Sequence, residues 1–236
     1  MKIAVIGSGN VATHLTEAFS AGPHLAVSVS SRTFDGLPTD ADLYLICVSD
    51  KAIEEVSGRL GPVAGVVAHT SGSVDIGVLS GHSRRGVWYP MQTFSKGDKI
   101  DYRQIPVFVE ASGSESMRVL RQAAEDFSDT VVEADSSQRK ALHIAAVFAC
   151  NFTNRLYAMA DDILNDAGLN FKLMLPLIHQ AVNKLHRLSP DMAQTGPASR
   201  GDFAICGKHL DYLADKAEYR DIYRLISDSI ARRRTE

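Results

Sequence analysis

The chain has 236 residues, enough for one large domain or two modest ones. Hydrophobic residues make up 45% and charged residues 22%, and 28 acids against 25 bases give a net charge of −3. This composition is typical of a globular protein, argues against disorder and makes nucleic acid an unexpected partner. No apolar run reaches the roughly 18–20 residues of a membrane helix, so we expect no membrane partner. A strand-like run from Lys2 leaves no room for a signal peptide, which predicts a cytoplasmic protein.

The first half of the chain alternates short apolar strands with helices. Lys2–Ile6 is a near-continuous apolar run, as expected of a buried parallel strand, and residues 11–21 have apolar side chains at helical spacing. A second helix is predicted after Ser49 and Asp50, which can cap it, and a third at residues 116–127. Further strands are predicted at residues 25–30, 42–48, 64–69, 86–89, 105–109 and 130–133. The alternation predicts a Rossmann-like, doubly wound parallel sheet with helices on both faces.

After about residue 135 the strand signal disappears. A long helix is predicted over residues 137–160, with a continuation that Gly168 stops. Further helices are predicted at residues 171–186, with a bend near Pro176, and at residues 207–213 and 219–232. The basic residues 232–234 are interpreted as a solvated helix end. The sequence therefore predicts an α/β domain over residues 1–134 and an all-α domain over residues 135–236.

A glycine-rich loop follows the first strand. Its residues fit the pattern G-x-G-x-x-[G/A] between a strand and a helix: Gly7, Ser8, Gly9, Asn10, Val11 and Ala12. In such a loop the first glycine permits a tight turn, the second lets the backbone approach a pyrophosphate, and the small third residue allows close packing. The helix N-terminus offers N–H groups to the phosphates. The alternative is a plain strand–helix turn that binds nothing.

The end of the second strand bears on the choice of dinucleotide. NAD-binding domains usually carry an acid about 20 residues after the loop, whereas here Ser31 and Arg32 occupy that place and the first acid is Asp35. A hydroxyl and a guanidinium suit a 2′-phosphate, which a carboxylate would repel. We therefore predict NADP(H) over NAD(H), unless Arg32 is merely a surface residue. The missing acid also weighs against S-adenosylmethionine and FAD.

Two further strand ends carry candidate contacts, because ligands of open parallel sheets lie outside the carboxyl ends of the strands. Val48 and Ser49 follow the third strand and are expected to border the cofactor. Thr70 and Ser71 follow the next strand and could face the nicotinamide or the substrate. The alternative for Thr70 and Ser71 is an ordinary polar turn.

The long helix carries few polar residues, set among small apolar ones. At about 100° per residue, Lys140 aligns with Asn151 and His143 with Asn154. One interpretation of this stripe is a hydrogen-bonded core network. The other is a substrate site that faces the nicotinamide across the domain cleft. There His143 or Lys140 would donate a proton to the carbonyl oxygen and Asn151 would orient it. In a later turn, Arg200 either binds a substrate carboxylate or pairs with Asp202.

Together these segments resemble a family of NADP oxidoreductases that join a Rossmann-like domain to a helical C-terminal domain of unknown function. That family belongs to the wider group of 6-phosphogluconate dehydrogenase-like, ketopantoate reductase-like and pyrroline-5-carboxylate reductase-like enzymes. The resemblance covers nearly the whole chain. Its motifs are the loop at 7–12, HTSG at 69–72, YPMQTF at 89–94, the helix at 143–151 and TGPASRGD at 195–202.

The resemblance implies a homodimer through the helical domain and an active site in the cleft between domains. It also implies a Lys and an Asn on the first long helix, for which Lys140 and Asn151 are candidates. Their eleven-residue spacing is wider than the family's, which favours His143 as the acid. The family usually has His where this chain has Tyr89, so Tyr89 replaces that residue or the role lies elsewhere. Tyr89, Gln92 and Arg200 are the substrate-binding candidates.

The sequence thus predicts an NADP(H)-dependent oxidoreductase that transfers a hydride to or from a small carbonyl or imine acid. A 2-keto acid such as ketopantoate is the substrate expected by analogy. The alternative is a non-catalytic NADP-binding sensor or assembly protein, which the lack of an unambiguous acid/base pair favours. No metal site is expected, because Cys47, Cys150 and Cys206 are few and far apart.

Overall fold

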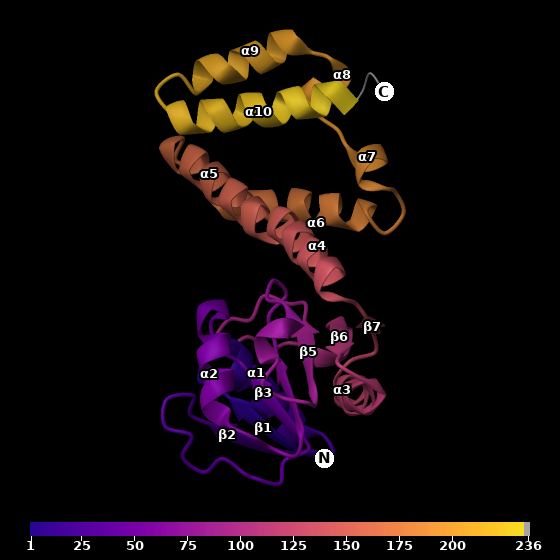
Figure 1. Ribbon diagram of the computed structural model, residues 1–236. Coiled ribbons are helices and arrows are strands. Elements are labelled where there is room, and N and C mark those ends of the chain that lie inside the picture. Colours follow the sequence, from indigo (N-terminus) through magenta and orange to yellow (C-terminus); the bar gives the residue numbers. More distant parts are fainter. Residues whose placement is uncertain (234–236) are drawn as a thin grey trace. The chain divides into compact units, whose positions relative to one another are not determined.

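The computed structural model describes residues 1–233, so Arg234 at the basic end lies outside the described residues. The contacts between Cα atoms divide the chain into a first unit, Met1–Ala149, and a second unit, Cys150–Glu236. The first unit contains a sheet and its helices, and the second is helical (Figure 1). The boundary predicted after residue 134 falls between the last strand and the next helix, and that helix still belongs to the first unit.

The first unit is built on one seven-stranded sheet of order β2-β1-β3-β4-β5-β6-β7. Its strands are β1 (Lys2–Ile6), β2 (Leu25–Val29), β3 (Leu43–Ile46), β4 (Val66–His69), β5 (Arg85–Pro90), β6 (Val107–Ala111) and β7 (Val131–Glu133), each at a predicted place. Strands β1 to β5 run parallel, as predicted. β6 runs antiparallel to β5, because the segment between them contains only a short 3₁₀ turn and no crossover helix.

Helices cover both faces of the sheet, which confirms the doubly wound arrangement. α1 (Asn10–Ala21) and α3 (Ser114–Phe127) pack with one apolar cluster, and α2 (Ile53–Leu60) packs with the other. Successive residues of a strand point to opposite faces, so Ile3 and Val5 join the first cluster while Ala4 and Ile6 join the second. All four side chains are fully buried, as expected of a parallel strand covered on both sides.

The long helix predicted after residue 135 is present, with an irregularity in its middle. α4 (Ser136–Ala146) begins at a capping box, in which Asp135 Oδ1 accepts from the Gln138 N–H at 2.8 Å and Gln138 Oε1 accepts from the Asp135 N–H at 3.0 Å. A π-helical segment, Val147–Phe152, separates α4 from α5 (Thr153–Asp166). Gly168, with a φ of 72°, follows the helix end.

The rest of the second unit consists of further helices. A 3₁₀ turn, Phe171–Met174, leads into α6 (Leu175–Lys184), and Pro176 lies in the first turn of α6, where proline is tolerated. The remaining helices are α7 (Pro190–Ala193), α8 (Pro197–Arg200), α9 (Phe203–Tyr212) and α10 (Ala217–Arg233). α7 and α8 were not predicted, because each is a single turn inside a segment whose glycine and proline indicate a loop. Across residues 1–233, no helix has the length and apolar character needed to cross a membrane.

Candidate active site

A cavity of about 610 Å³ lies at the carboxyl ends of β1 to β4. The topology brings four predicted segments to it, since parallel strands end at the same edge of a sheet. They are the glycine loop after β1, Ser31 and Arg32 after β2, Val48 and Ser49 after β3, and Thr70 after β4. The remaining lining residues were not predicted to contact the cofactor: Cys47, Ala52, Glu55, Val56, Arg59 and Phe94.

The glycine loop has the geometry that its pattern predicts. Gly7 has a φ of 147°, and a Cβ there would lie 2.1 Å from the carbonyl oxygen of Cys47, so only glycine fits. Gly9 differs, because a Cβ on it would meet no atom within 4 Å. Gly9 is the N-cap of α1, no side chain caps this helix, and its first turn contains no acid. The loop therefore offers open space and a helix N-terminus at the edge of the cavity, which suits a phosphate group.

Asn10 and His14 of α1 fix the segment that contains Phe94. Asn10 Nδ2 donates to the carbonyl oxygen of Phe94 at 3.0 Å. His14 is buried, with Nδ1 2.9 Å from the Tyr102 hydroxyl and Nε2 2.9 Å from the Ser95 carbonyl oxygen. The Asn10 side chain thereby places Phe94 in the wall of the cavity, and Asn10, predicted as a cofactor-binding residue, lines the same cavity. The pairing joins residues more than 80 positions apart in the sequence, and no local pattern indicates it.

Ser31 and Arg32 line the cavity beside Arg59 of α2. The Arg59 guanidinium donates to the carbonyl oxygens of both residues, from Nη1 to Ser31 at 3.3 Å and from Nη2 to Arg32. Its central carbon also lies 5.2 Å from the centre of the Phe34 ring. The turn after β2 is thus supported by a helix residue that the sequence motif does not include.

The two hydroxyl residues predicted to face the ligand in the turn after β4 lie in different environments. Thr70 lines the cavity, whereas Ser71 is buried and its Oγ accepts from the N–H groups of Ser73 and Val74, at 3.1 Å each. His69 Nδ1 accepts from the Ser71 N–H at 3.2 Å. Burial, with a smaller contribution from the positive charge of Arg139, lowers the pKa of His69 to about 4. His69 is therefore neutral near pH 7.

Tyr89 and His143 lie together in the first unit. Their ring centres are 6.5 Å apart and their planes are inclined at 65°. Tyr89 ends close to the turn after β4, since a Cβ on Gly72 would lie 2.7 Å from its Cζ. Burial raises the pKa of the Tyr89 hydroxyl, which therefore remains protonated at neutral pH. The structure thus places two of the predicted residues next to one another at the carboxyl edge of the sheet.

A buried ion pair connects α4 to the sheet. Arg139 has no exposed surface, and its Nη2 lies 3.0 Å from Glu110 Oε2 and donates to the Val74 carbonyl oxygen at 2.9 Å. Ser136 Oγ donates to the same Glu110 oxygen at 2.8 Å. Residues four apart share a helix face, so the contacts that fix Arg139 also fix the side of α4 from which His143 projects toward Tyr89. The sequence did not reveal this pair, since a charged residue near a helix start normally faces water.

The polar stripe predicted along the long helix takes a different form. Lys140, Asn151 and Asn154 are exposed, so they do not form the buried network that was one interpretation. Asn151 lies within the π-helical segment. That segment winds less tightly than an α-helix, so the constant rotation behind the predicted alignments does not apply across it. Irregular turns of this kind occur frequently at functional sites.

Gln92 and Arg200, predicted to bind substrate, are exposed and do not line the cavity of the first unit. The Gln92 side chain accepts from the Thr93 N–H at 2.8 Å. Asp202, the alternative partner of Arg200, accepts from the Ile205 N–H at 3.2 Å and so caps α9. In the second unit, the segment that precedes Arg200 lines a mostly apolar cavity of about 280 Å³ together with residues of α5 and α10.

Comparisons with known proteins place the chain in a family. The family described as "Domain of unknown function (DUF2520)" matches residues 105–230. No curated protein matches the chain. A solved structure described as a putative NADP oxidoreductase from Bacteroides fragilis is 38% identical, with a TM-score of 0.88, and the match covers 98% of both chains.

More distant structures share the fold alone. A protein from Thermotoga maritima is 19% identical over the whole of both chains, with a TM-score of 0.77. A 1-pyrroline-5-carboxylate reductase from Streptococcus pyogenes is 14% identical over 98% of both chains, with a TM-score of 0.63. The chain therefore belongs to the DUF2520 family, whose members here combine a Rossmann-like α/β unit with a helical C-terminal part.

Proposed function

We propose that the chain is an NADP(H)-dependent oxidoreductase that transfers a hydride to or from a small carbonyl or imine acid, with a 2-keto acid such as ketopantoate as a substrate. The cavity that joins the glycine loop, Ser31, Arg32 and Thr70 carries this proposal. The name of the Bacteroides fragilis relative, an NADP oxidoreductase, supports it. Relatives with the same fold include pyrroline-carboxylate and imine reductases.

The residues of the cavity fit NADP(H). The open space at Gly9 and the uncapped start of α1 would receive the pyrophosphate. The Ser31 hydroxyl and the Arg32 guanidinium would receive the 2′-phosphate. When bound, the reduced cofactor supplies the hydride, and it leaves all proton transfer to the protein.

Tyr89 and His143 are the proposed acid pair. Hydride addition to a carbonyl or imine carbon leaves an electron pair on oxygen or nitrogen that requires a proton. Tyr89, whose pKa is raised, would donate a hydrogen bond to that atom. His143 would deliver the proton, since its imidazole ring lies beside Tyr89 and a protonated ring nitrogen can act as a general acid. Lys140 and Asn151 are proposed to orient the substrate.

Titration with NADPH and with NADH, followed by nicotinamide fluorescence, tests the cofactor. We expect the dissociation constant of NADPH to be at least about tenfold lower, because a 2′-phosphate adds charge-assisted hydrogen bonds. The variant Gly9→Val should weaken both cofactors, since it fills the space open to the pyrophosphate. Gly113→Val is the matched control, because Gly113 is also an N-cap glycine at which an added Cβ would meet no atom within 4 Å.

Absence of binding to either cofactor, or a Gly9→Val variant that binds as tightly as the wild type, would overturn the proposal. A panel of 2-keto acids and imines, assayed by NADPH oxidation, then tests the substrate class. Tight NADPH binding without turnover of any member would favour the sensor or assembly role instead.

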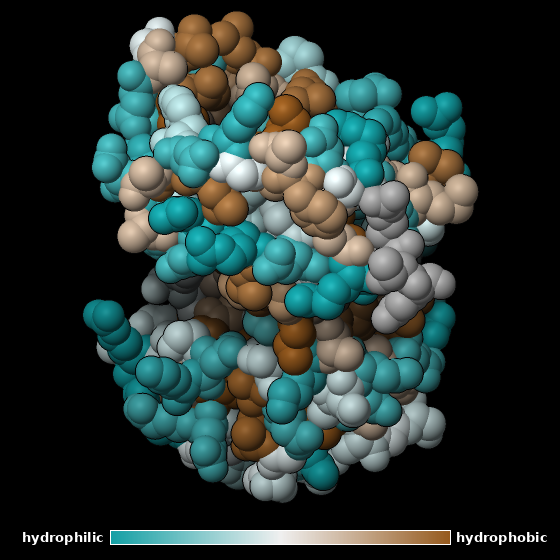
Figure 2. Space-filling view, turned by 90° about the horizontal axis from the view of Figure 1, so that it is seen from above, coloured by the Kyte–Doolittle hydropathy of each residue, from teal (hydrophilic) through white to brown (hydrophobic). Residues whose placement is uncertain are grey.

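The helical unit supports a second proposal, a homodimer. Among the described residues of the second unit, four apolar ones are buried, namely Met159, Ala198, Cys206 and Leu213. By contrast, many large apolar side chains are exposed in the described residues. All of them lie at or after Ile144, except Leu25 and Val132. Figure 2 shows such apolar patches among hydrophilic residues on one face of the molecule. Exposed apolar area of this extent is typical of a protein interface.

Sedimentation equilibrium should therefore give twice the 25.6 kDa mass of one chain. Leu177→Glu, at a site 65% exposed on α6, should shift the protein toward monomer, because a charge would be buried in the interface. Leu25→Glu is the control, since Leu25 is 62% exposed but lies on β2. A wild-type protein that is monomeric at all concentrations would contradict the dimer.

A further inference from the structure

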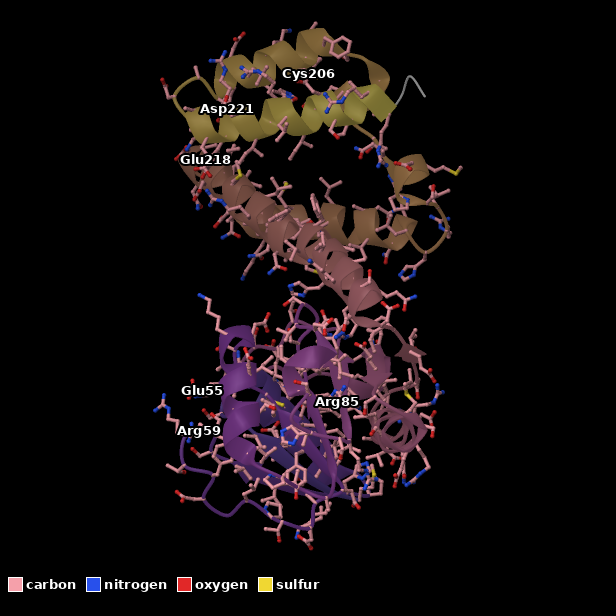
Figure 3. All side chains as sticks on the ribbon, in the orientation of Figure 1. Glu55, Arg59, Arg85, Cys206, Glu218 and Asp221 are labelled. Atoms are coloured by element: carbon pink, nitrogen blue, oxygen red, sulfur yellow. The ribbon has the colours of Figure 1, made fainter. Side chains whose placement is uncertain are left out.

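One wall of the cavity is formed by two charged residues of α2. Glu55 and Arg59 are one turn apart, both line the cavity, and they project from the same side of the helix (Figure 3). Glu55 Oε1 lies 3.7 Å from Arg59 Nη1. Among the described residues that line the cavity, Glu55 is the only acid, because the loop after β2 contributes only Ser31 and Arg32 to the lining. This carboxylate requires an explanation in a cavity that fits a 2′-phosphate.

The contacts of Arg59 determine which groups of the β2 turn face the cavity. Its two terminal nitrogens donate to the carbonyl oxygens of Ser31 and Arg32. A carbonyl oxygen that accepts from the Arg59 guanidinium has its partial negative charge offset, so it repels a bound anion less than a free carbonyl would. The side chains of Ser31 and Arg32 are thereby left for the ligand, while the Arg32 N–H donates to Ser30 Oγ at 3.3 Å.

Arg59 also supports a turn with an unusual backbone. Phe34 has a φ of 58°, a left-handed conformation that is uncommon for a bulky residue, and its N–H donates to the Ser30 carbonyl oxygen at 2.9 Å. The Arg59 guanidinium lies over the Phe34 ring at 5.2 Å. One side chain thus contacts the turn at three residues and holds it in a conformation that the chain does not readily adopt alone.

We propose that Arg59 sets the preference for a 2′-phosphorylated dinucleotide, as a positioning residue for the Ser31–Arg32 turn and as the counter-charge that screens Glu55. The inference rests on the proposed NADP(H) cofactor. Without Arg59, the Glu55 carboxylate would repel a 2′-phosphate but could accept a hydrogen bond from a free 2′-hydroxyl. Loss of Arg59 therefore changes the ratio of the two affinities and does not simply weaken binding.

The test measures dissociation constants for NADPH and NADH in four forms of the full chain. Arg59→Ala is expected to raise the dissociation constant of NADPH by about 10–100-fold, which is the range for loss of hydrogen bonds to charged groups. The dissociation constant of NADH should change by less than about threefold. Glu55→Gln should bind NADPH at least as tightly as the wild type. The double variant should regain part of the NADPH affinity that Arg59→Ala loses, because the unscreened carboxylate is gone.

Two further variants separate this role from a general effect on folding. Arg59→Lys retains the charge but not the two-pronged donation, so its NADPH loss should be smaller than that of Arg59→Ala. Arg121→Ala is the control, since Arg121 also pairs with a glutamate four residues away, Glu125 on α3, and does not line the cavity. It should bind both cofactors like the wild type.

The outcomes distinguish the inference from the proposed function. If Arg59→Ala loses NADPH and NADH affinity equally, or loses no NADPH affinity, the proposed role of Arg59 is overturned. The proposed NADP(H) cofactor still stands in that case, provided that the wild type prefers NADPH. A double variant that binds NADPH as weakly as Arg59→Ala overturns the screening of Glu55. A wild-type protein that binds neither cofactor overturns the proposed function, and this inference with it.

Discussion

Replacing His143 by alanine is expected to lower kcat by about 10²–10⁴-fold, the usual contribution of a general acid. The affinity for NADPH should not change, because His143 faces Tyr89 and does not line the cofactor cavity. Single-turnover oxidation of bound NADPH, measured with the best substrate of the panel, separates the chemical step from binding.

The control for this prediction is His179→Ala, which removes an exposed histidine from α6. Tyr89→Phe provides a second comparison, because it removes only the hydroxyl. If Tyr89 and His143 act on the same atom of the substrate, their effects should not add. The double variant should then be only slightly less active than the less active of the two single variants. Full turnover by His143→Ala would show that the proton comes from another residue.

The elements that the sequence predicted are those whose signal is local. A strand such as β3 or β4 is buried on both faces, so its apolar run is visible without knowledge of its neighbours. The glycine loop also has a local signal, because its pattern lies directly between β1 and α1, although the contact that excludes a Cβ at Gly7 comes from Cys47 after β3. The direction of β6 was not predictable in this way. It depends on the path of the segment between β5 and β6, which has no regular pattern.

The parts of the site that were missed depend on contacts between distant residues. Arg59 and Arg139 carry charge and occur among other polar residues, and no pattern in the sequence indicates the distant groups that they contact. Arg139 is buried because Glu110 and Val74, far away in the chain, surround it. The π-helical segment was missed for a related reason, since the residues Val147–Phe152 have ordinary helical character and the change in winding leaves no compositional signal.

The buried pair of Arg139 and Glu110 leads to the second large prediction. Arg139→Met is expected to lower the free energy of unfolding by about 3–5 kcal/mol, because it leaves the Glu110 carboxylate, whose side chain is only 17% exposed, without its counter-charge. Glu110→Gln should destabilise the protein by a similar mechanism, since it leaves Arg139 uncompensated. Urea denaturation followed by the fluorescence of Trp88, the single and fully buried tryptophan, reports on the first unit.

The double variant decides whether the pair acts through charge. Removing both partners eliminates the unpaired ion, so the double variant should be less destabilised than the sum of the two single changes. Arg103→Met is the matched control, because Arg103 pairs with Asp129 where both side chains are at least half exposed, and its loss should cost less than about 1 kcal/mol. Strict additivity of the Arg139 and Glu110 changes would mean that the charge interaction between them does not help to fix α4 to the sheet. In that case the direction of His143 would not depend on the ion pair.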